Sequence, residues 1–531
     1  MPRFAALDLG SNALRLRIVE ANAGGEQPWR EVVNLRAPVR LGSEVFVTGK
    51  LGNAQIGQAC VALREFRQSM DDAKVDAYRA TATSAVREAS NGSTLVERAR
   101  REAGIDLDVI EGIEEARLIQ LAVVRKLALG EKRALLVDVG GGSTELTYMD
   151  HGRSAWAISM PIGTVRLLEM YLKGNKTVSS GHQKLLFEGV DRALAEAIPT
   201  LRKMPFEVMV GTGGSVDTLV ELCPSKTDVA GFSRAVDVPL MKSLLGQLFA
   251  LTPDERRETY QLRPDRADTI VTASSIFLRV AELLKVPAIV APGVGLKEGI
   301  LAELVEKHFK TWDNEGEAYA VFEACTRLGK RYGFDQAHGE LVASLASSLF
   351  DDMGSYHGFG ERERLLLKAA ALLHDVGDYV RYDGHHKHSY YLIQNSDIMG
   401  LTPDERAIVA NVARYHRKGA PDPAHPNFRD LDKDARTKVR GLAAILRIAD
   451  ALDREHLGKV ASVRAEIDPK ARRMILHATG AEDRELEEWT VRAKSELLRE
   501  VYDLEVAVAG SSTSTRPAPK EPVGMTTARV R

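Results

Sequence analysis

At 531 residues the chain is too long for one hydrophobic core, and typical domain sizes predict about three or four domains. Hydrophobic residues make up 44% and charged residues 27%, as in ordinary globular proteins, and 72 Lys and Arg against 74 Asp and Glu give a net charge of −2. This balance excludes recruitment of a polyanion by a global basic field, and three cysteines are too few for a disulfide framework or a cysteine-based zinc site.

Roughly the first 300 residues alternate short apolar runs with amphipathic stretches, which indicates an α/β fold. The predicted strands are rich in Val, Ile and Leu, and they cover residues 4–9, 14–20, 134–139, 145–149, 208–210 and 288–291. Helical periodicity is clear at 114–129 and 184–201.

One internal repeat stands out in this part. The segments ALDLGSNALRLRIV and LVDVGGGSTELTYM both read as an apolar strand, an aspartate, a glycine-rich turn and a second apolar strand. The aspartates are Asp8 and Asp138. The repeat predicts a duplicated lobe.

Each repeated turn has the residues of a phosphate site. Glycines let backbone N–H groups approach phosphate oxygens, while Ser11, Asn12 and Ser143 add side-chain donors. Asp8 and Asp138 are placed to hold a hydrated Mg²⁺. Both turns lead into a strand, whereas dinucleotide-binding and Walker-type loops open a helix, so those two classes are excluded. A plain β-turn explains DLGSN taken alone, whereas the three consecutive glycines of DVGGGSTE indicate that something must come close to the backbone.

Two further glycine-rich turns, at 208–221 and 289–301, follow strands and open helices, whose N-terminal N–H groups can face an anion. The alternative for each is a plain β–α turn. Together the four turns predict a cleft between two lobes. The predicted phosphate-binding residues are Asp8, Gly10, Ser11, Asn12, Gly140, Gly141, Gly142, Ser143, Gly211, Gly213, Gly214 and Ser215.

Residues 1–306 resemble the exopolyphosphatase/guanosine pentaphosphate phosphohydrolase family, a branch of the actin-like and sugar-kinase superfamily. The matching motifs are DLGSN at 8–12, TATSAVR at 81–87, EGIEEARL at 111–118, DVGGGSTE at 138–145 and GTGGS at 211–215. The resemblance implies two ribonuclease-H-like lobes, 1–125 and 126–306. It also implies Mg²⁺-dependent (or Mn²⁺-dependent) release of terminal orthophosphate from inorganic polyphosphate, with guanosine pentaphosphate (pppGpp) as the alternative substrate.

The resemblance also assigns roles to three side chains. It makes Glu115 the general base and Arg87 a phosphate-contacting residue, and Glu145 could hold Mg²⁺ with Asp138 or orient the water. From the residues alone, the alternatives are a surface helix carboxylate for Glu115, which that reading favours, an exposed strand position for Glu145 and a solvated helix charge for Arg87.

From about residue 315 the pattern becomes helical, with predicted helices at 317–330, 338–352, 361–375, 403–416 and 436–454. Eight of the 13 histidines fall between His338 and His425. This region, 315–457, resembles an HD-type metal phosphohydrolase. The resemblance implies a divalent-metal site, to which extra histidines can add a second ion; its residues are His338, His374, Asp375, His388, His416 and Asp450. The alternative is a helical lid whose histidines bond backbone carbonyls or touch phosphate.

Two basic clusters in this region, 381–388 and 414–418, interleave with tyrosines. Such clusters fit a phosphate chain or single-stranded nucleic acid, or form a solvated face. Residues 458–509 read as a small α+β domain with strands at 460–466, 473–478 and 503–508 and a helix at 484–499. The tail at 510–531, rich in Ser, Thr and Pro, is expected to be disordered.

No apolar run reaches the roughly 18–20 residues of a membrane span, and no signal-peptide pattern is present, so a cytoplasmic protein is expected. We expect no membrane partner and no specific nucleic acid, and the family resemblance implies a homodimer. Three rival functions stay open: an ATP-dependent kinase on the same fold, a non-catalytic polyphosphate-binding protein, and nucleotide hydrolysis at the helical region.

Overall fold

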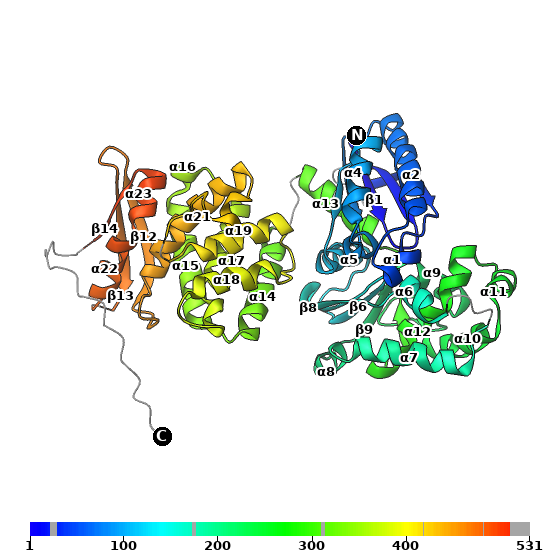
Figure 1. Ribbon diagram of the computed structural model, residues 1–531. Coiled ribbons are helices and arrows are strands. Elements are labelled where there is room, and N and C mark those ends of the chain that lie inside the picture. Colours follow the sequence, from blue (N-terminus) through cyan, green and yellow to red (C-terminus); the bar gives the residue numbers. More distant parts are fainter. Residues whose placement is uncertain (22–28, 173–176, 310–313, 418, 482, 510–531) are drawn as a thin grey trace, which may run out of the picture. The chain divides into compact units, whose positions relative to one another are not determined.

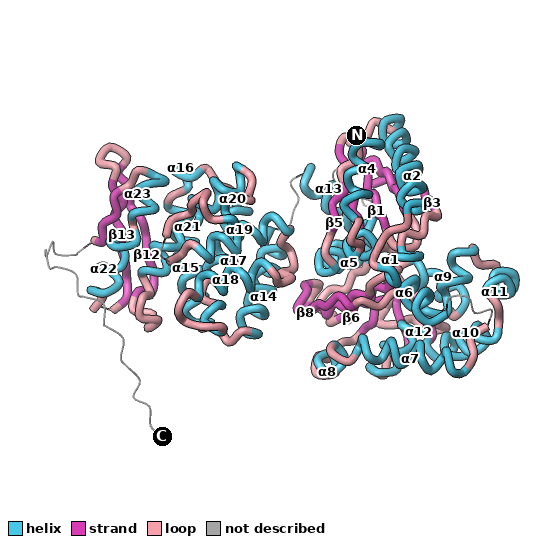
Figure 2. Tube along the Cα trace, viewed as in Figure 1, coloured by secondary structure: helices cyan, strands magenta, loops and turns pink. Residues whose placement is uncertain are grey.

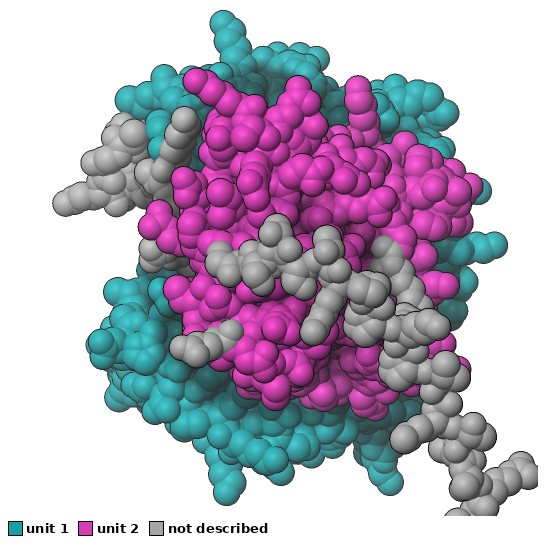
Figure 3. All heavy atoms as spheres, turned by 90° about the vertical axis from the view of Figure 1, so that its left-hand side faces the viewer, with its two compact units in different colours: residues 1–324, 397–402 teal, residues 325–396, 403–531 magenta. Residues whose placement is uncertain are grey.

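The computed structural model of the chain describes residues 1–21, 29–172, 177–309, 314–417, 419–481 and 483–509. The chain divides into two compact units, which Figure 3 colours separately. Unit 1 comprises Met1–Ala324 and Asp397–Thr402, and unit 2 comprises Cys325–Ser396 and Pro403–Arg531. Lys418 of the second basic cluster and the tail at 510–531 lie outside the described residues.

The first sheet of unit 1 has five strands in the order β3-β2-β1-β4-β5. Strands β1, β2 and β3 form an antiparallel meander, whereas β4 and β5 continue the sheet in parallel with β1. Their bounds are β1 Arg3–Leu9, β2 Leu14–Ala21, β3 Trp29–Ala37, β4 Ala77–Ala82 and β5 Leu107–Val109. Strand β1 is buried from its second residue onward, as expected for a central strand covered on both faces.

The second sheet has six strands in the order β10-β11-β9-β6-β7-β8. Their bounds are β6 Ala134–Val139, β7 Thr144–Asp150, β8 Arg153–Met160, β9 Val208–Thr212, β10 Ala235–Asp237 and β11 Ala288–Val290. The meander β6, β7 and β8 is antiparallel, and β9 and β11 follow in parallel with β6. Read outward from the meander, β8-β7-β6-β9-β11 repeats the order of the first sheet, as the internal repeat predicts.

The two repeated hairpins have the same register. Leu9 pairs with Leu14 in the first, and Val139 pairs with Thr144 in the second. In each, the backbone N–H of the first turn glycine donates to the carbonyl oxygen three residues on: Gly10 to Ala13 at 3.2 Å and Gly140 to Ser143 at 3.0 Å. The sequence repeat is therefore a repeat of one turn geometry.

Helices cover the sheets of unit 1, as Figure 1 shows. The long ones are α2 Asn53–Asp72, α4 Gly92–Ala103, α5 Gly112–Lys126, α7 Ser180–Leu194, α10 Val238–Ala250, α12 Pro264–Leu284 and α13 Leu296–Phe309. One apolar cluster joins the two sheets, because Phe4 of β1 and Leu136 of β6 pack with Ile119 of α5 and Ile300 of α13. This shared core fixes α5 between the two repeated hairpins.

Unit 2 combines helices with one small sheet (Figure 2). The boundary between the two units falls within α14 Asn314–Arg331, and the main helices within unit 2 are α15 Gln336–Asp352, α17 Glu361–Leu373, α18 His385–Gln394, α19 Pro403–Arg414 and α21 Lys433–Ala451. The sheet has the order β12-β13-β14, with bounds Val460–Asp468, Arg473–Gly480 and Glu505–Val508. Between β13 and β14 lie α22 Glu485–Lys494 and α23 Glu496–Tyr502.

The sequence patterns located β1, β2, β6, β7, β9 and β11 and overlooked β3, β4, β5, β8 and β10. Strand β3, WREVVNLRA, is largely exposed and lies at a sheet edge, so it lacks the apolar run on which the prediction relied. Helix α18 was also missed, because its first turn is a run of histidines. Among the helices of the described residues, none has the length and hydropathy that crossing a membrane requires.

Candidate active site

Unit 1 contains a cavity of about 230 Å³ that is lined by all four glycine-rich turns. The turn residues in its wall are Gly10, Ser11, Asn12, Gly140, Gly141, Ser143, Gly213, Gly214, Ser215, Gly293 and Gly295. Asp8 and Asp138, which precede the first two turns, line the same cavity. Segments far apart in the sequence therefore meet at one site, as expected.

The two repeated hairpins touch each other at this cavity. A Cβ atom on Gly141 would lie 2.8 Å from Cβ of Ser11 and 3.4 Å from the backbone nitrogen of Asn12. Ser11 is itself buried, and its Oγ lies 3.0 Å from Oγ of Ser84. Glycine at position 141 is what lets the second turn approach the first.

Three carboxylates converge beside the turns. Glu115 comes from the first turn of α5, Asp138 from β6 and Glu145 from β7, and one ligand atom of each lies within 4.8 Å of the others. Their side chains are buried, with 7%, 5% and 1% exposed, respectively. Asp138 and Glu145 are direct partners across the antiparallel pair. One oxygen of Glu115 and one of Glu145 are buried without a hydrogen-bond donor.

Burial, and then the charge of neighbouring carboxylates, raises the pKa of each of these acids; for Asp138 that neighbour is Asp8. Desolvation, with Asp138 as the next cause, raises the pKa of Glu145 to about 8. Desolvation raises the pKa of Asp138 to about 6, although a 2.6 Å hydrogen bond from Thr212 opposes the shift. The pKa of Glu115 is well above its usual value, again through desolvation and then the charge of Glu145. Without a cation, this group retains protons at neutral pH.

The carboxylate trio has the properties of a divalent-metal site. Hard oxygen ligands suit Mg²⁺ or Mn²⁺, and the two buried oxygens without donors are free to bind one. A divalent ion would also relieve the repulsion that raises the three pKa values. The residues present therefore fit the metal that the sequence predicts.

Positive charge lies elsewhere around the cavity. Arg15 lines it and pairs with Asp8 at 2.9 Å, and Lys297 lines it at the start of α13. Arg266 of α12 is buried and hydrogen-bonds Ser215, and burial lowers its pKa to about 10, which still leaves it charged at neutral pH. These three cations were not among the predicted site residues. Arg15 and Lys297 had a sequence signal, because Arg15 lies in the first repeated segment and Lys297 in the glycine-rich segment 289–301, whereas Arg266 had none.

The third turn provides a helix N-terminus. Helix α9, Gly214–Leu222, begins after Gly213, whose φ of +91° favours glycine. A Cβ atom on Gly213 would also lie 2.5 Å from the carbonyl oxygen of Val139. The glycine thus allows the end of β6 and the start of α9 to meet at the cavity wall.

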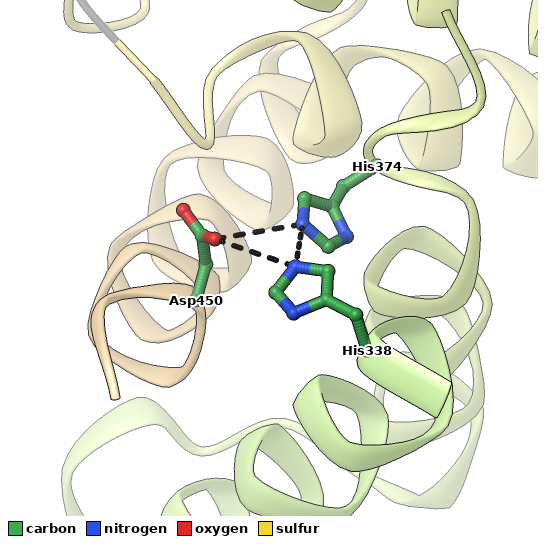
Figure 4. A group of neighbouring side chains, drawn as sticks. All are labelled: His338, His374 and Asp450. Carbon is green, nitrogen blue, oxygen red and sulfur yellow. Dashed lines mark hydrogen bonds and ion pairs between the residues drawn. The ribbon is translucent and has the colours of Figure 1, made fainter. Parts of the chain in front are cut away.

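Unit 2 contains a second group of titratable side chains, part of which is drawn in Figure 4. His338 of α15, His374 at the end of α17 and Asp450 of α21 point toward one another. The Nε2 atoms of the two histidines are 3.2 Å apart, and Oδ1 of Asp450 lies 3.8 and 3.6 Å from them. Burial alone would lower the pKa of His374, but Asp375 and Asp450 raise it to about 9.

The sequence matches the model of the Ppx/GppA phosphatase family over residues 18–308, which is more than half of the chain. The chain belongs to the Ppx/GppA phosphatase family. A second match, described as Ppx/GppA phosphatase, domain III, covers residues 323–501. Enzymes of this family hydrolyse phosphoanhydride bonds and generally depend on a divalent metal.

Among curated relatives, the guanosine-5'-triphosphate,3'-diphosphate pyrophosphatase of Aeromonas hydrophila is 27% identical over 410 residues, which cover 77% of this chain and 79% of that protein. The protein of the same name from Vibrio parahaemolyticus is 27% identical over 418 residues, covering 78% and 81%. Both names give guanosine-5'-triphosphate,3'-diphosphate (pppGpp) as the compound on which the relatives act.

Among solved structures, an exopolyphosphatase from Cytophaga hutchinsonii is 28% identical with a TM-score of 0.52, covering 57% of this chain and 98% of that one. An exopolyphosphatase-like protein is 28% identical with a TM-score of 0.53, covering 58% and 99%. The relatives thus carry two different substrate names within one Ppx/GppA family.

In this Ppx/GppA chain, Gly211 does not fit its predicted role in phosphate binding. It lies inside β9, where a Cβ atom would come within 2.9 Å of side-chain atoms of Ile289 and Val216 and 3.1 Å of Phe277. Gly211 is absent from the cavity wall, and its glycine is required by core packing instead.

Three other predicted residues lie behind the wall of the cavity. Gly142 packs against Phe46, where a Cβ atom would lie 2.2 Å from the ring, and Glu145 sits beneath the second turn with Ser159 donating to it at 2.7 Å. Arg87 donates to the carbonyl oxygen of Ile110 at 2.6 Å and acts electrostatically on Glu115 and Glu145.

The predicted ligands of unit 2 come together with one exception, His388. It lines a neighbouring pocket of about 480 Å³ with His386, Lys387, Arg414 and Arg417, and it is not part of any of the candidate ligand groups among the described residues. The place expected for it is taken by His385, three residues earlier on α18, whose Nε2 lies 3.1 Å from Oδ1 of Asp375. A one-turn offset along the helix explains the difference.

Proposed function

We propose that this Ppx/GppA phosphatase is an exopolyphosphatase, which hydrolyses the terminal phosphoanhydride bond of inorganic polyphosphate and releases orthophosphate with Mg²⁺ (or Mn²⁺) as cofactor. One observation carries the proposal: a buried carboxylate trio, Glu115, Asp138 and Glu145, stands beside two glycine hairpins that touch across one cavity. The second candidate, hydrolysis of pppGpp, is favoured by the names of the curated relatives.

The terminal phosphoryl group would lie between the hairpins. Backbone N–H groups of the turns, together with the Ser11 and Ser143 hydroxyls and the Asn12 amide, offer donors to its oxygens. Arg15 and Lys297 add positive charge from the first lobe and from the start of α13. Such preorganised donors and charges are the main source of catalysis in phosphoryl transfer.

Glu115 would take the proton from the attacking water. Its carboxylate is buried in the cavity wall, and a raised pKa matches a general base to neutral pH. Asp138 and Glu145 would hold the divalent ion, which supplies Lewis-acid polarisation of the phosphoryl oxygens when bound. Arg87 donates to the carbonyl oxygen of Ile110 rather than pointing into the cavity. Its role would therefore be to limit the rise in the pKa of Glu115, not to contact phosphate.

For unit 2 we propose an HD-like helical domain followed by a small α+β domain. The support is that His338 and His374, 3.2 Å apart through their Nε2 atoms, each lie within 3.8 Å of a carboxylate oxygen of Asp375 and of Asp450. This set would hold one divalent ion. The proposal for unit 1 does not depend on it, because the two sites share no residue.

The test compares phosphate release from long-chain polyphosphate and from pppGpp by the purified full chain, with Mg²⁺ and Mn²⁺ in parallel. We expect faster turnover of polyphosphate, and turnover of pppGpp alone would select the second candidate. Glu115→Gln should abolish release from either substrate while polyphosphate binding persists. The matched control is Glu114→Gln on the same helix turn, whose carboxylate pairs with Arg79 and Arg117 instead. Normal turnover by Glu115→Gln would remove the assigned base.

A further inference from the structure

Three tyrosines of unit 2, close together in the sequence, expose most of their rings to solvent. Tyr379 is 66%, Tyr382 62% and Tyr391 64% exposed. Among the other Phe, Tyr and Trp side chains of the described residues, the most exposed are Trp489 at 44% and Tyr319 at 42%. Large rings that stay exposed together are uncommon on a protein surface unless they serve a contact, so the three tyrosines indicate a binding surface.

Arginine side chains accompany the tyrosines of this region. The guanidinium carbon of Arg417 lies 5.4 Å from the ring centre of Tyr382, and that of Arg414 lies 5.6 Å from the ring centre of Tyr390. These distances are those of cation–π contacts. Each contact holds a permanent positive charge next to an aromatic ring.

The same combination of ring and cation occurs around Tyr379. The ring of Tyr379 meets that of Tyr332 edge to face, with 5.4 Å between the ring centres, and Arg331 lies 5.8 Å from the ring centre of Tyr332. Arg381 is exposed between Tyr379 and Tyr382 in the sequence. Aromatic rings and guanidinium groups are therefore neighbours at each part of this surface.

A pocket of about 480 Å³ belongs to the same surface, and its wall is mostly basic. Its basic side chains are His386, Lys387, His388, Arg414, Arg417 and His425. The only carboxylate in the described part of the wall is that of Asp383. Lys387 and Tyr391 are four residues apart on α18, so they project from the same side of the helix. The pocket thus suits an anion, with an exposed ring beside it.

Exposed rings and cations together match single-stranded nucleic acid. Its unpaired bases stack on aromatic side chains, while its phosphates contact neighbouring lysines and arginines. Inorganic polyphosphate carries the phosphates but no ring, so it would use Lys387, Arg414 and Arg417 and gain nothing from the tyrosines. The three exposed rings therefore favour nucleic acid over a phosphate chain at this surface.

We propose that unit 2 binds single-stranded nucleic acid through a tyrosine–arginine surface. The surface comprises Tyr379, Arg381, Tyr382, Lys387, Tyr391, Arg414 and Arg417. Stacking tolerates any base, so the binding is independent of sequence, which agrees with the expectation of no specific nucleic acid. The proposal goes beyond the exopolyphosphatase activity, because nucleic acid is joined by phosphodiester rather than phosphoanhydride bonds.

The test measures how fluorescently labelled oligouridylate and oligodeoxythymidylate bind the purified full chain, by fluorescence anisotropy without divalent ions. Tyr382→Leu and Tyr391→Leu keep an apolar side chain but remove the stacking face, so each should weaken binding by roughly fivefold or more. Tyr319→Leu is the matched control and should bind like wild type, because Tyr319 is an exposed tyrosine of unit 1 that also lies beside an arginine. Comparing the two oligonucleotides shows whether the surface prefers RNA or DNA.

A second series separates stacking from charge. Lys387→Gln should weaken both oligonucleotides and long-chain polyphosphate and lower their salt dependence, whereas Lys184→Gln, a 79% exposed lysine of unit 1, should change neither. Polyphosphate binding should stay at the wild-type level in Tyr382→Leu and Tyr391→Leu.

Three outcomes would overturn the proposal. They are no binding of either oligonucleotide, wild-type binding by both tyrosine variants, and an equal loss of polyphosphate binding in those variants. The last two would leave a phosphate chain as the ligand of the basic pocket. The substituted side chains are exposed, so the variants should fold, and circular dichroism checks this. No arm measures phosphate release, so the proposal can fail while the proposed exopolyphosphatase stands.

Discussion

Asp138 and Glu145 are direct cross-strand partners in β6 and β7, whereas the same position in the first hairpin pairs Asp8 with Arg15. The two hairpins share a turn geometry but differ in charge. The first neutralises its own aspartate through a 2.9 Å ion pair, and the second places two acids side by side in a buried site. Like charges directly opposite destabilise a sheet. The second hairpin therefore has no arginine paired with its aspartate in the way that Arg15 pairs with Asp8, and this asymmetry supports the metal position proposed for the second lobe.

The first prediction concerns the pH dependence of stability without metal. The pKa of Glu145 in the folded protein is about 8 against 4.5 for the free side chain, so the folded state binds its proton more tightly. The stability that protonated Glu145 contributes to the folded state is complete below pH 4.5 and is lost as the pH rises through 8. We expect the melting temperature of the metal-free protein to fall by several degrees between pH 6 and 9, and the fall to be smaller in Glu145→Gln.

Added Mg²⁺ provides the control for this prediction, because the ion binds the ionised carboxylates. It should stabilise the wild-type protein more at pH 8 than at pH 6, and Glu145→Gln less at both. Calorimetry of the two proteins across this pH range measures the effect. An equal pH slope in wild type and variant would show that Glu145 is not the group responsible.

The second prediction concerns Arg87, whose charge lowers the pKa of both Glu115 and Glu145. Removing the charge should raise the pKa of the base, so Arg87→Gln should shift the acidic limb of the pH–rate profile to higher pH. Arg87→Lys keeps the charge and should leave the limb close to its wild-type position, although its single ammonium cannot replace the guanidinium fork. A lower rate in Arg87→Gln with no shift of the limb would indicate a direct contact with phosphate instead.

The internal repeat and the four turns could be predicted because each depends on local sequence. Strand, aspartate and glycine turn are read directly from residues near Asp8 and Asp138, and the structure brings those turns to one cavity. Gly211 was assigned to that set because it opens the GTGGS motif at 211–215. Glycine is required there by the side chains of Val216 and Phe277, which only tertiary packing reveals.

The place of Arg266 in the cavity and of His385 among the histidine and aspartate ligands of unit 2 could not be derived from local patterns. Arg266 reaches Ser215 from a helix that starts some 50 residues later in the chain, and no spacing in the sequence announces that contact. His385 and His388 both belong to one histidine-rich segment, and only the start and phase of α18 decide which ring faces Asp375. The phase of a helix fixes the direction in which each side chain points. The sequence did not predict α18, so the directions of its histidines could not be predicted either.

The third prediction concerns the contact between the two hairpins. Gly141→Ala introduces a methyl group about 2.8 Å from Cβ of Ser11, so the turns must separate. We expect phosphate release to fall by roughly tenfold or more, because small displacements of positioned donors are costly in catalysis. The control is Gly246→Ala in α10, where a Cβ atom meets nothing within 4 Å and alanine should stabilise by about 0.5–1 kcal/mol. Full activity of Gly141→Ala would show that the close approach is dispensable.

The fourth prediction concerns Glu303 of α13, which joins three elements of unit 1. Its carboxylate pairs with Arg79 of β4 at 2.7 Å and with Arg117 of α5 at 2.6 Å. Burial alone would raise the pKa of Glu303, but the charges of Arg117 and Arg79 outweigh burial and hold the pKa at about 2. Glu303→Gln leaves two partly buried guanidinium groups with one partner fewer, so we expect a loss of about 2–3 kcal/mol in the free energy of unfolding.

The pH dependence of this loss identifies its cause. Because the pKa of Glu303 is lower in the folded state, its ionised carboxylate stabilises the folded protein at any pH above the unfolded pKa of about 4.5. This stabilisation disappears as the pH falls toward the folded pKa of about 2. The difference between wild type and Glu303→Gln in urea denaturation should therefore be full at pH 7 and shrink steadily below pH 4.5. Glu188→Gln, which removes an exposed pair with Lys184 at 3.9 Å, should change stability by less than about 0.5 kcal/mol at any pH. A Glu303→Gln difference that stays constant down to pH 3 would mean that packing, rather than charge, is what the carboxylate contributes.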